Sequence, residues 1–127
     1  MTTPTAITHT AITPTAITPA QLPAVIGSYL TAHAAGDADA AARSFAPSAV
    51  VVDEGHTFRG AEEVLGFLRR AGGQYTYTTE LVGAERVDDA HWVATNRLEG
   101  DFPGGVVDLR YRFALADGLI AELVIAP

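Results

Sequence analysis

The spacing of apolar residues changes near residue 73, and this change limits the chain to one broad architecture. Before that point apolar residues recur at helical spacing, about every 3.6 residues, and after it they alternate with polar ones. The clearest alternation is Val107, Leu109, Tyr111, Phe113 and Leu115. Helices followed by strands with one buried and one wetter face predict an α+β domain.

Three helices are expected in the first half. The first begins at Thr18-Pro19, with Pro23 as an alternative start, and ends at Gly36, a residue that favours helix C-termini. The second covers about residues 37–45, and the third covers 60–70. One face of the first helix carries Leu22, Val25, Ile26, Tyr29, Leu30 and His33.

The second half predicts a sheet. Strands are expected at about 74–82, 84–88, 91–100, 106–116 and 119–126, with one earlier strand at Val50–Val52. Turns are expected at Asp88-Asp89 and Ala116-Asp117-Gly118, with a longer loop at 102–105. The predicted fold is a curved mixed, mostly antiparallel sheet wrapped around three N-terminal helices, a cone with a pocket inside it.

The N-terminus is a short tandem repeat. The pentads TAITH, TAITP and TAITP occupy residues 5–9, 10–14 and 15–19. They contain no charge, and their prolines interrupt both helices and central strands. We therefore expect residues 1–18 to be a flexible leader and residues 19–127 to form a single domain.

Composition excludes several classes of partner. A net charge of −7 and a pI of about 4.8 argue against nucleic acid and anionic membranes, which need clustered Lys and Arg. No apolar stretch approaches the roughly 20 residues of a membrane span. The chain has no cysteine, so no disulfide or thiolate chemistry is expected. With no signal-peptide pattern, the cytoplasm is the default location.

The segment Val50–Gly60 has the sequence VVVDEGHTFRG and concentrates ionisable groups at a strand exit. The β-branched run predicts a strand buried on both faces. It ends in Asp53, Glu54 and His56, where burial raises a carboxyl pKa and an imidazole titrates near neutrality. The segment fits a proton-transfer site or, alternatively, a solvated acidic turn. A metal site from these three residues is disfavoured, because no helix-spaced His pair supports it.

The order of elements and several local motifs resemble the nuclear transport factor two-like superfamily, in its SnoaL-like polyketide cyclase and ketosteroid isomerase branch. The resemblance covers about residues 20–127. Its motifs are Tyr29…Gly36-Asp37, Phe45-Ala46-Pro47, Val50–Asp53, Phe58-Arg59-Gly60 and Tyr111-Arg112-Phe113…Asp117-Gly118. The same fold also hosts epoxide hydrolases, dehydratases and non-catalytic binding domains, so the resemblance implies the fold more strongly than the activity.

The resemblance implies roles for two residues. Tyr29 falls where ketosteroid isomerases carry the tyrosine that donates to a developing enolate oxygen, and Asp53 falls at their aspartate base. Those enzymes use a protonated acid as a second donor, on the strand that corresponds to about 107–113. This chain offers Leu109 or Arg110 there, with Asp108 beside them. The usual pair of oxyanion donors is therefore missing.

Further candidates surround these two. His56 or His33 would be a second acid or base, although a His on an apolar helix face is more often a satisfied core residue. Asn96 would line the pocket or make a structural hydrogen bond. The other expected pocket-lining residues are Trp92, Phe67 and Tyr111. Epoxide hydrolases on this fold use a relay of Asp, Arg and Asp side chains. Arg97, Arg110 and Asp108 supply these residue types, but their placement on alternating strands does not favour a relay.

These observations predict a small enzyme of the isomerase or cyclase type, without a cofactor, acting on a hydrophobic carbonyl compound such as a polyketide or terpenoid. Asp53 would be the catalytic base and Tyr29 the polar donor, assisted by His56 or His33. The alternative is a non-catalytic small-molecule binding domain on the same fold. The resemblance also implies a homodimer through the outer face of the sheet, where Tyr75, Tyr77 and Thr79 are expected.

Overall fold

One sheet of seven strands, in the order β1-β4-β5-β6-β7-β2-β3, frames the molecule. The computed structural model describes residues 14–71 and 77–127. The strands are β1 (Thr15–Ile17), β2 (Phe45–Asp53), β3 (His56–Arg59), β4 (Tyr77–Arg86), β5 (His91–Gly100), β6 (Val106–Ala116) and β7 (Leu119–Ala126). The helices are the 3₁₀ turn η1 (Pro19–Gln21), α2 (Ala24–Ala34), α3 (Ala38–Ala42) and α4 (Gly60–Ala71). All neighbouring strands are antiparallel except β2 and β7, which are parallel.

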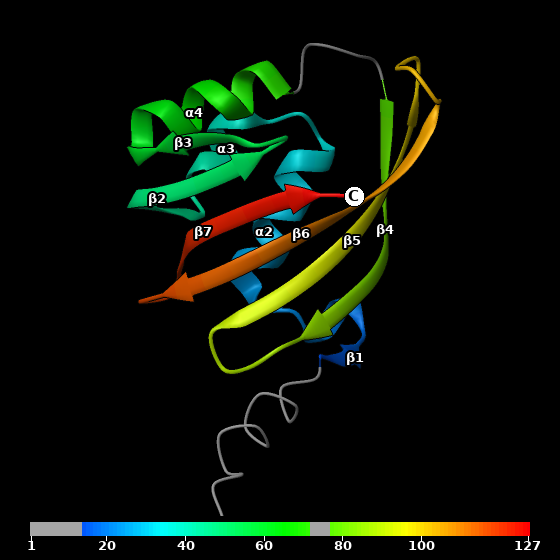
Figure 1. Cartoon of the computed structure of the whole chain (residues 1–127). Coiled ribbons are helices and arrows are strands. Elements are labelled where there is room, and N and C mark those ends of the chain that lie inside the picture. The colour runs from blue at the N-terminus through cyan, green and yellow to red at the C-terminus, as the bar shows by residue number, and fades with distance from the viewer. Residues whose placement is uncertain (1–13, 72–76) are drawn as a thin grey trace, which may run out of the picture.

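The sheet curves around the helices, which cover one of its faces (Figure 1). We call the helix-covered side the inner face and the opposite side the outer face. The core between them includes Ile26 and Tyr29 from α2, Val64 from α4, and Phe113 and Leu123 from the sheet, each at most 2% exposed. The predicted fold class, a curved and mostly antiparallel sheet around three helices, is confirmed.

The first helix begins at the later of its two expected starts. Pro23 precedes α2, while Pro19 begins the short 3₁₀ turn η1. Gly36 follows the helix with φ of +72°, a conformation that glycine adopts without strain. Asp37 caps α3 through a 3.0 Å hydrogen bond donated by the Ala40 backbone N–H. The expectation that α3 reaches about Phe45 is wrong, because Phe45 already pairs with β7 as the first residue of β2.

The apolar run Val50–Val52 lies inside β2, but it is not buried on both faces as expected. Val51 is fully buried on the inner face, whereas Val50 and Val52 are only partly buried. The sequence analysis also missed β3. Glu54 and Gly55 adopt φ values of +52° and +79° and form a tight two-residue turn, so His56 pairs directly with Asp53.

Strand β4 is a single strand where two shorter ones were expected. A register shift between Leu81 and Gly83 lets it continue along β5. Strands β5, β6 and β7 have the expected extents. The third pentad, which we had assigned to the leader, contributes β1: Thr15–Ile17 pairs with β4 and Ile17 packs against the core. Residues 1–13 and Tyr75 lie outside the described residues.

Candidate functional site

A rung of paired residues across the sheet places Asp53 on the inner face. Asp53 is opposite Ile125, Ile125 is opposite Tyr111, and Tyr111 is opposite Ala94. Directly paired residues share a face, and Tyr111 and Ala94 are both buried there. The carboxyl group of Asp53 therefore lies at the end of β2 on the face that the helices cover.

The environment of Asp53 favours its neutral form. Burial raises the pKa of the Asp53 carboxyl above its ordinary value, and the nearby negative charge of Glu54 raises it further. His56 acts in the opposite direction. A half-buried carboxylate with a raised pKa is a better proton acceptor than a fully solvated one, which suits a general base.

Helix α2 presents two of the predicted residues one turn apart. The rings of Tyr29 and His33 stack, with centroids 5.5 Å apart and planes inclined by 7°. The rings of Phe45 and Phe113 pack against the Tyr29 ring in edge-to-face contacts, with ring centroids 5.4 and 5.7 Å from that of Tyr29. The Tyr29 hydroxyl is buried without a hydrogen-bond partner. Burial raises the pKa of Tyr29, with Tyr111, Tyr77 and Asp53 adding to the effect, so this hydroxyl is a neutral donor.

His33 is bound to the sheet by a hydrogen bond. Its Nε2 lies 3.0 Å from the hydroxyl oxygen of Tyr111, and its pKa is lowered by burial, which keeps the imidazole neutral. Burial also raises the pKa of the Tyr111 hydroxyl. The two groups form one neutral pair that connects α2 to β6.

Asn96 lies beside this pair. A long side-chain hydrogen bond with Asn96 lowers the pKa of the Tyr111 hydroxyl, against the larger and opposite effect of burial. Only 2% of Asn96 is exposed, and its Nδ2 has no hydrogen-bond partner within normal bonding distance. Asn96 lies on the inner face, and its interaction with Tyr111 is a structural hydrogen bond longer than the normal range.

Tyr77 belongs to the same interior and was not predicted as a site residue. It lies in register with Thr79, which pairs with Leu98, and Leu98 shares the inner face with Asn96. Burial and the charge of Asp53 both raise the pKa of the Tyr77 hydroxyl. The expectation that Tyr77 covers the outer face is wrong, and the alternation of β4 with β5 is the signal that places it inside.

Other predicted residues lie apart from this group. His56 is exposed on β3, directly opposite Asp53. Trp92 pairs with Phe113. These two residues lie two positions along their strands from Ala94 and Tyr111, which are on the rung of Asp53, so they face the same side. Phe67 is a buried residue of α4, and its ring centroid lies 4.9 Å from that of Phe58.

The Arg and Asp residues that could form an epoxide-hydrolase relay do not meet in the interior. Arg97 donates two hydrogen bonds, of 2.8 and 3.0 Å, to Asp108, and this pair lies on the outer face. Arg110 points to the same face and pairs with Glu85 at 3.4 Å.

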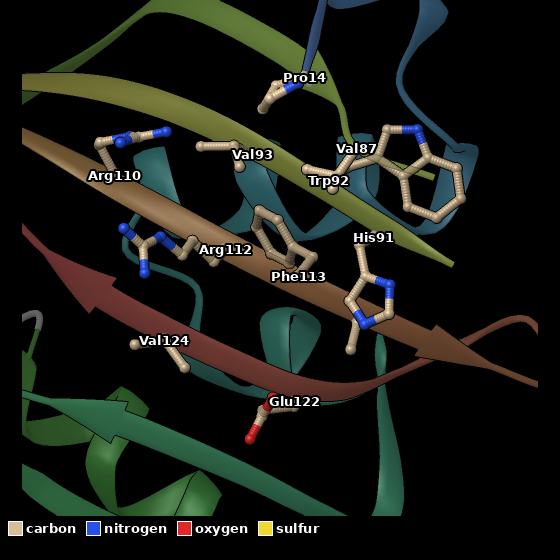
Figure 2. Close-up of a pocket in the computed structure, with 11 residues that line it drawn as sticks. Pro14, Val87, His91, Trp92, Val93, Arg110, Arg112, Phe113, Glu122 and Val124 are labelled. Atoms are coloured by element: carbon tan, nitrogen blue, oxygen red, sulfur yellow. The ribbon is translucent and has the colours of Figure 1, made fainter. Parts of the chain in front are cut away.

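The outer face has a concavity of about 470 Å³. Figure 2 shows its side chains along β5, β6 and β7, with Pro14 at the margin. Val93 and Val124 provide apolar surface, and Arg110, Arg112 and Glu122 provide both signs of charge. Trp92 and Phe113, which hold inward-facing positions, also line this concavity, whereas Asp53 and Tyr29 do not.

No helix among residues 14–71 and 77–127 is long and apolar enough to cross a membrane. Within the same residues no cluster of three His, Asp or Glu side chains is arranged to hold a metal ion.

The fold and its inward-facing polar group define an α+β cone of the nuclear transport factor two-like kind. The family model of the SnoaL-like domain matches residues 26–123, and the chain belongs to this family. A structure from Sinorhizobium meliloti, provisionally designated a polyketide cyclase, is 34% identical with a TM-score of 0.80, covering 87% of this chain and all (100%) of that one.

More distant structures share the fold. A protein from Catenulispora acidiphila with a ketosteroid isomerase-like fold, solved with trimethylamine, has a TM-score of 0.73 at 18% identity over 84% of this chain and 87% of that chain. A nuclear transport factor two-like protein from Cytophaga hutchinsonii has a TM-score of 0.66 at 11% identity over 87% and 89%. No curated protein matches the chain.

Proposed function

We propose that this protein is a cofactor-independent enzyme of the isomerase or cyclase type. Its substrate is a hydrophobic carbonyl compound of the polyketide or terpenoid kind. Asp53 is the base, and Tyr29 donates a hydrogen bond to the carbonyl oxygen. The observation that carries the proposal is that the helix-covered side of the sheet holds both a carboxyl with a raised pKa, Asp53, and a buried phenol without a hydrogen-bond partner, Tyr29, close enough for the charge of Asp53 to raise the pKa of Tyr29. Membership of the SnoaL-like family and the likeness to the Sinorhizobium protein support it.

The chemistry follows from these two groups. The Asp53 carboxylate removes a proton from the carbon next to the carbonyl. The electrons of the C–H bond form the C=C bond of the enolate, and the π electrons of the carbonyl move onto its oxygen. The Tyr29 hydroxyl stabilises the resulting enolate by a hydrogen bond, which strengthens as negative charge develops. In an isomerisation, protonated Asp53 returns the proton to another carbon. In a cyclisation, the enolate carbon attacks a second carbonyl, whose oxygen takes up the proton.

The histidines have different parts in this proposal. His33 is a positioning residue, because its ring stacks on Tyr29 and its Nε2 bonds to Tyr111. His56 is exposed opposite Asp53 and assists by adjusting the affinity of that carboxyl for protons. The neutral pair of His33 and Tyr111, together with Asn96, Trp92 and Phe67, contributes to binding.

Solvent-deuterium exchange tests the proposed function without knowledge of the natural substrate. The protein is incubated in D₂O with 2-tetralone, 6-methoxy-2-tetralone and hydrophobic β,γ-unsaturated ketones, and deuterium at the carbon next to the carbonyl is followed by NMR. We expect acceleration over buffer for at least one compound. A folded protein that accelerates none of them would contradict the proposal.

The pH profile of this exchange is predicted from the neighbours of Asp53. Because the ionised carboxylate is the base, the rate falls as pH falls through the raised pKa of Asp53. Removing a negative neighbour in Glu54→Gln moves this acidic limb to lower pH. Removing a positive neighbour in His56→Ala moves it to higher pH. Shifts in the same direction for both variants would contradict Asp53 as the titrating base.

We also propose that the protein is a cytoplasmic homodimer that joins two copies through the outer face. The mixed apolar and charged concavity supports a self-complementary surface, since a two-fold axis brings the same patch of both copies together. Sedimentation at micromolar concentration should give twice the 13.3 kDa of one chain. Val124→Glu should give the single-chain mass, and Glu62→Lys on α4 should not. A wild-type protein that sediments as one chain would refute the dimer.

A binding domain without catalysis is the second candidate. It is favoured by the absence of a carboxylic donor near Tyr29 on β6, where Leu109 and Arg110 stand. Saturable binding of the same ketones with no accelerated exchange would establish this candidate instead.

A further inference from the structure

Two buried side-chain polar atoms among the described residues have no hydrogen-bond partner at normal distance: the Tyr29 hydroxyl and Nδ2 of Asn96. The amide of Asn96 has two N–H donors, and its long interaction with Tyr111 occupies at most one of them. Folded proteins satisfy the large majority of such atoms, and one left alone costs about 1–3 kcal/mol. The proposed reaction uses the Tyr29 hydroxyl, whereas none of its steps names the atom that pairs with Nδ2 of Asn96. An amide nitrogen is a donor only, so a ligand that pairs with it must supply an acceptor.

The sheet places Asn96 far from the base. From Asp53 on β2, the order of strands leads through β7 and β6 to β5, which is three inter-strand steps or about 14 Å along the sheet. Asn96 is two residues beyond Ala94, the residue on the rung of Asp53, which adds about 7 Å along the strand. The curvature of the sheet and the inward reach of both side chains shorten this path but do not close it.

One carbonyl group cannot serve both positions. The carbon that loses a proton lies only about 2.4 Å from the oxygen of its own carbonyl. A compound whose reacting carbon lies at Asp53 therefore holds its own carbonyl oxygen near that end of the site. The acceptor for Asn96 must be a different oxygen, at the other end of the molecule.

The surroundings of Asn96 favour a neutral acceptor. His33 is neutral and already bonded to Tyr111, and burial keeps Tyr111 itself protonated. The next inward-facing neighbours of Asn96 on β5 are Ala94 and Leu98, both buried and apolar. A charged oxygen would find no cation among these groups, whereas a carbonyl, ether or hydroxyl oxygen needs only the amide N–H.

We propose that Nδ2 of Asn96 binds a second, neutral oxygen of the ligand, remote from the carbonyl that reacts. The substrate class is then a dioxygenated hydrophobic compound, with one oxygen at each end of the inner face. This inference rests on the proposed function only for placing the reacting carbonyl beside Asp53.

A matched pair of fluorescent probes tests the inference. Both 6-methoxy-2-naphthol and 6-ethyl-2-naphthol resemble the enol of a tetralone, but only the methoxy compound has an acceptor at the remote end. We expect the wild-type protein to bind the methoxy probe about fivefold more tightly, the effect of one neutral hydrogen bond. Equal affinities, or no binding of either probe up to its solubility limit, would overturn the inference.

Variants assign the effect to Asn96. In Asn96→Leu the two probes should bind with equal affinity, whereas Thr95→Val, at the neighbouring outer-face position, should keep the preference. A preference that survives in folded Asn96→Leu would overturn the assignment. If circular dichroism shows that Asn96→Leu does not fold, the comparison of the two probes on the wild-type protein still tests the inference. Probe binding needs no turnover, so it is independent of whether deuterium exchange requires Asp53.

Discussion

Asp53→Asn should lower the rate of deuterium exchange by about 10²–10⁴-fold, the usual contribution of a positioned general base. The amide keeps the size and shape of the carboxyl but has no lone pair of comparable basicity. Because Asp53 is only half-buried and ends β2 beside a turn, the substitution should leave the fold intact.

The control for this variant is a substitution of the adjacent carboxylate, Glu54. Glu54→Gln removes a charge one residue away, at an exposed turn position, and should keep the exchange rate within about twofold on the pH plateau. The probe naphthols should still bind to Asp53→Asn, since the proposed hydrogen-bond donors are unchanged. Full exchange activity in Asp53→Asn would remove Asp53 from the mechanism and with it the proposed assignment of the base.

Phe113→Ala should be the most destabilising single change discussed, at about 3–5 kcal/mol. Phe113 is 1% exposed, and its ring centroid lies 5.7 Å from that of Tyr29 in an edge-to-face contact. Truncation leaves a cavity between α2 and the sheet that the neighbouring side chains fill only in part. A loss of this size is a large part of the 5–15 kcal/mol that typically separates folded from unfolded domains.

Urea unfolding measures this loss as a lower midpoint with an unchanged slope. Val106→Ala, on the same strand and 54% exposed, is the matched control and should change stability by no more than about 0.5 kcal/mol. A loss below about 1 kcal/mol in Phe113→Ala would show that the core does not depend on this ring. The variant should also weaken naphthol binding, because Tyr29 loses a neighbour that fixes its ring.

The strands that were predicted best carry a local signal. Val106–Ala116 and Leu119–Ala126 agree with the expected ranges, because their alternation and the Asp117-Gly118 turn are contained in the segment itself. The missed strand, His56–Arg59, is short and polar and forms by pairing with β2 through a tight turn. The end of α3 was also missed, because the pairing of Phe45 with distant Ile120 overrides an Ala-rich helical sequence.

In the candidate site, too, features with a local sequence signal were predicted and those set by distant contacts were missed. Tyr29 and Asp53 were identified from motifs along the chain, and the structure places both in the interior. The hydrogen bond between His33 and Tyr111 joins residues 78 positions apart, and no spacing rule predicts it. Tyr77 was assigned to the wrong face, since only the pairing of β4 with β5 determines which of its alternating residues point inward.

The pairing of Thr15–Ile17 with β4 affects how shortened forms of this protein are designed. A fragment that starts at the first helix would leave the backbone groups of Ala84, Glu85 and Arg86 unpaired at an open sheet edge. Such an edge is a template for pairing with another chain, so the fragment would be prone to aggregate. Expression fragments and N-terminal fusions should therefore keep the third TAIT pentad.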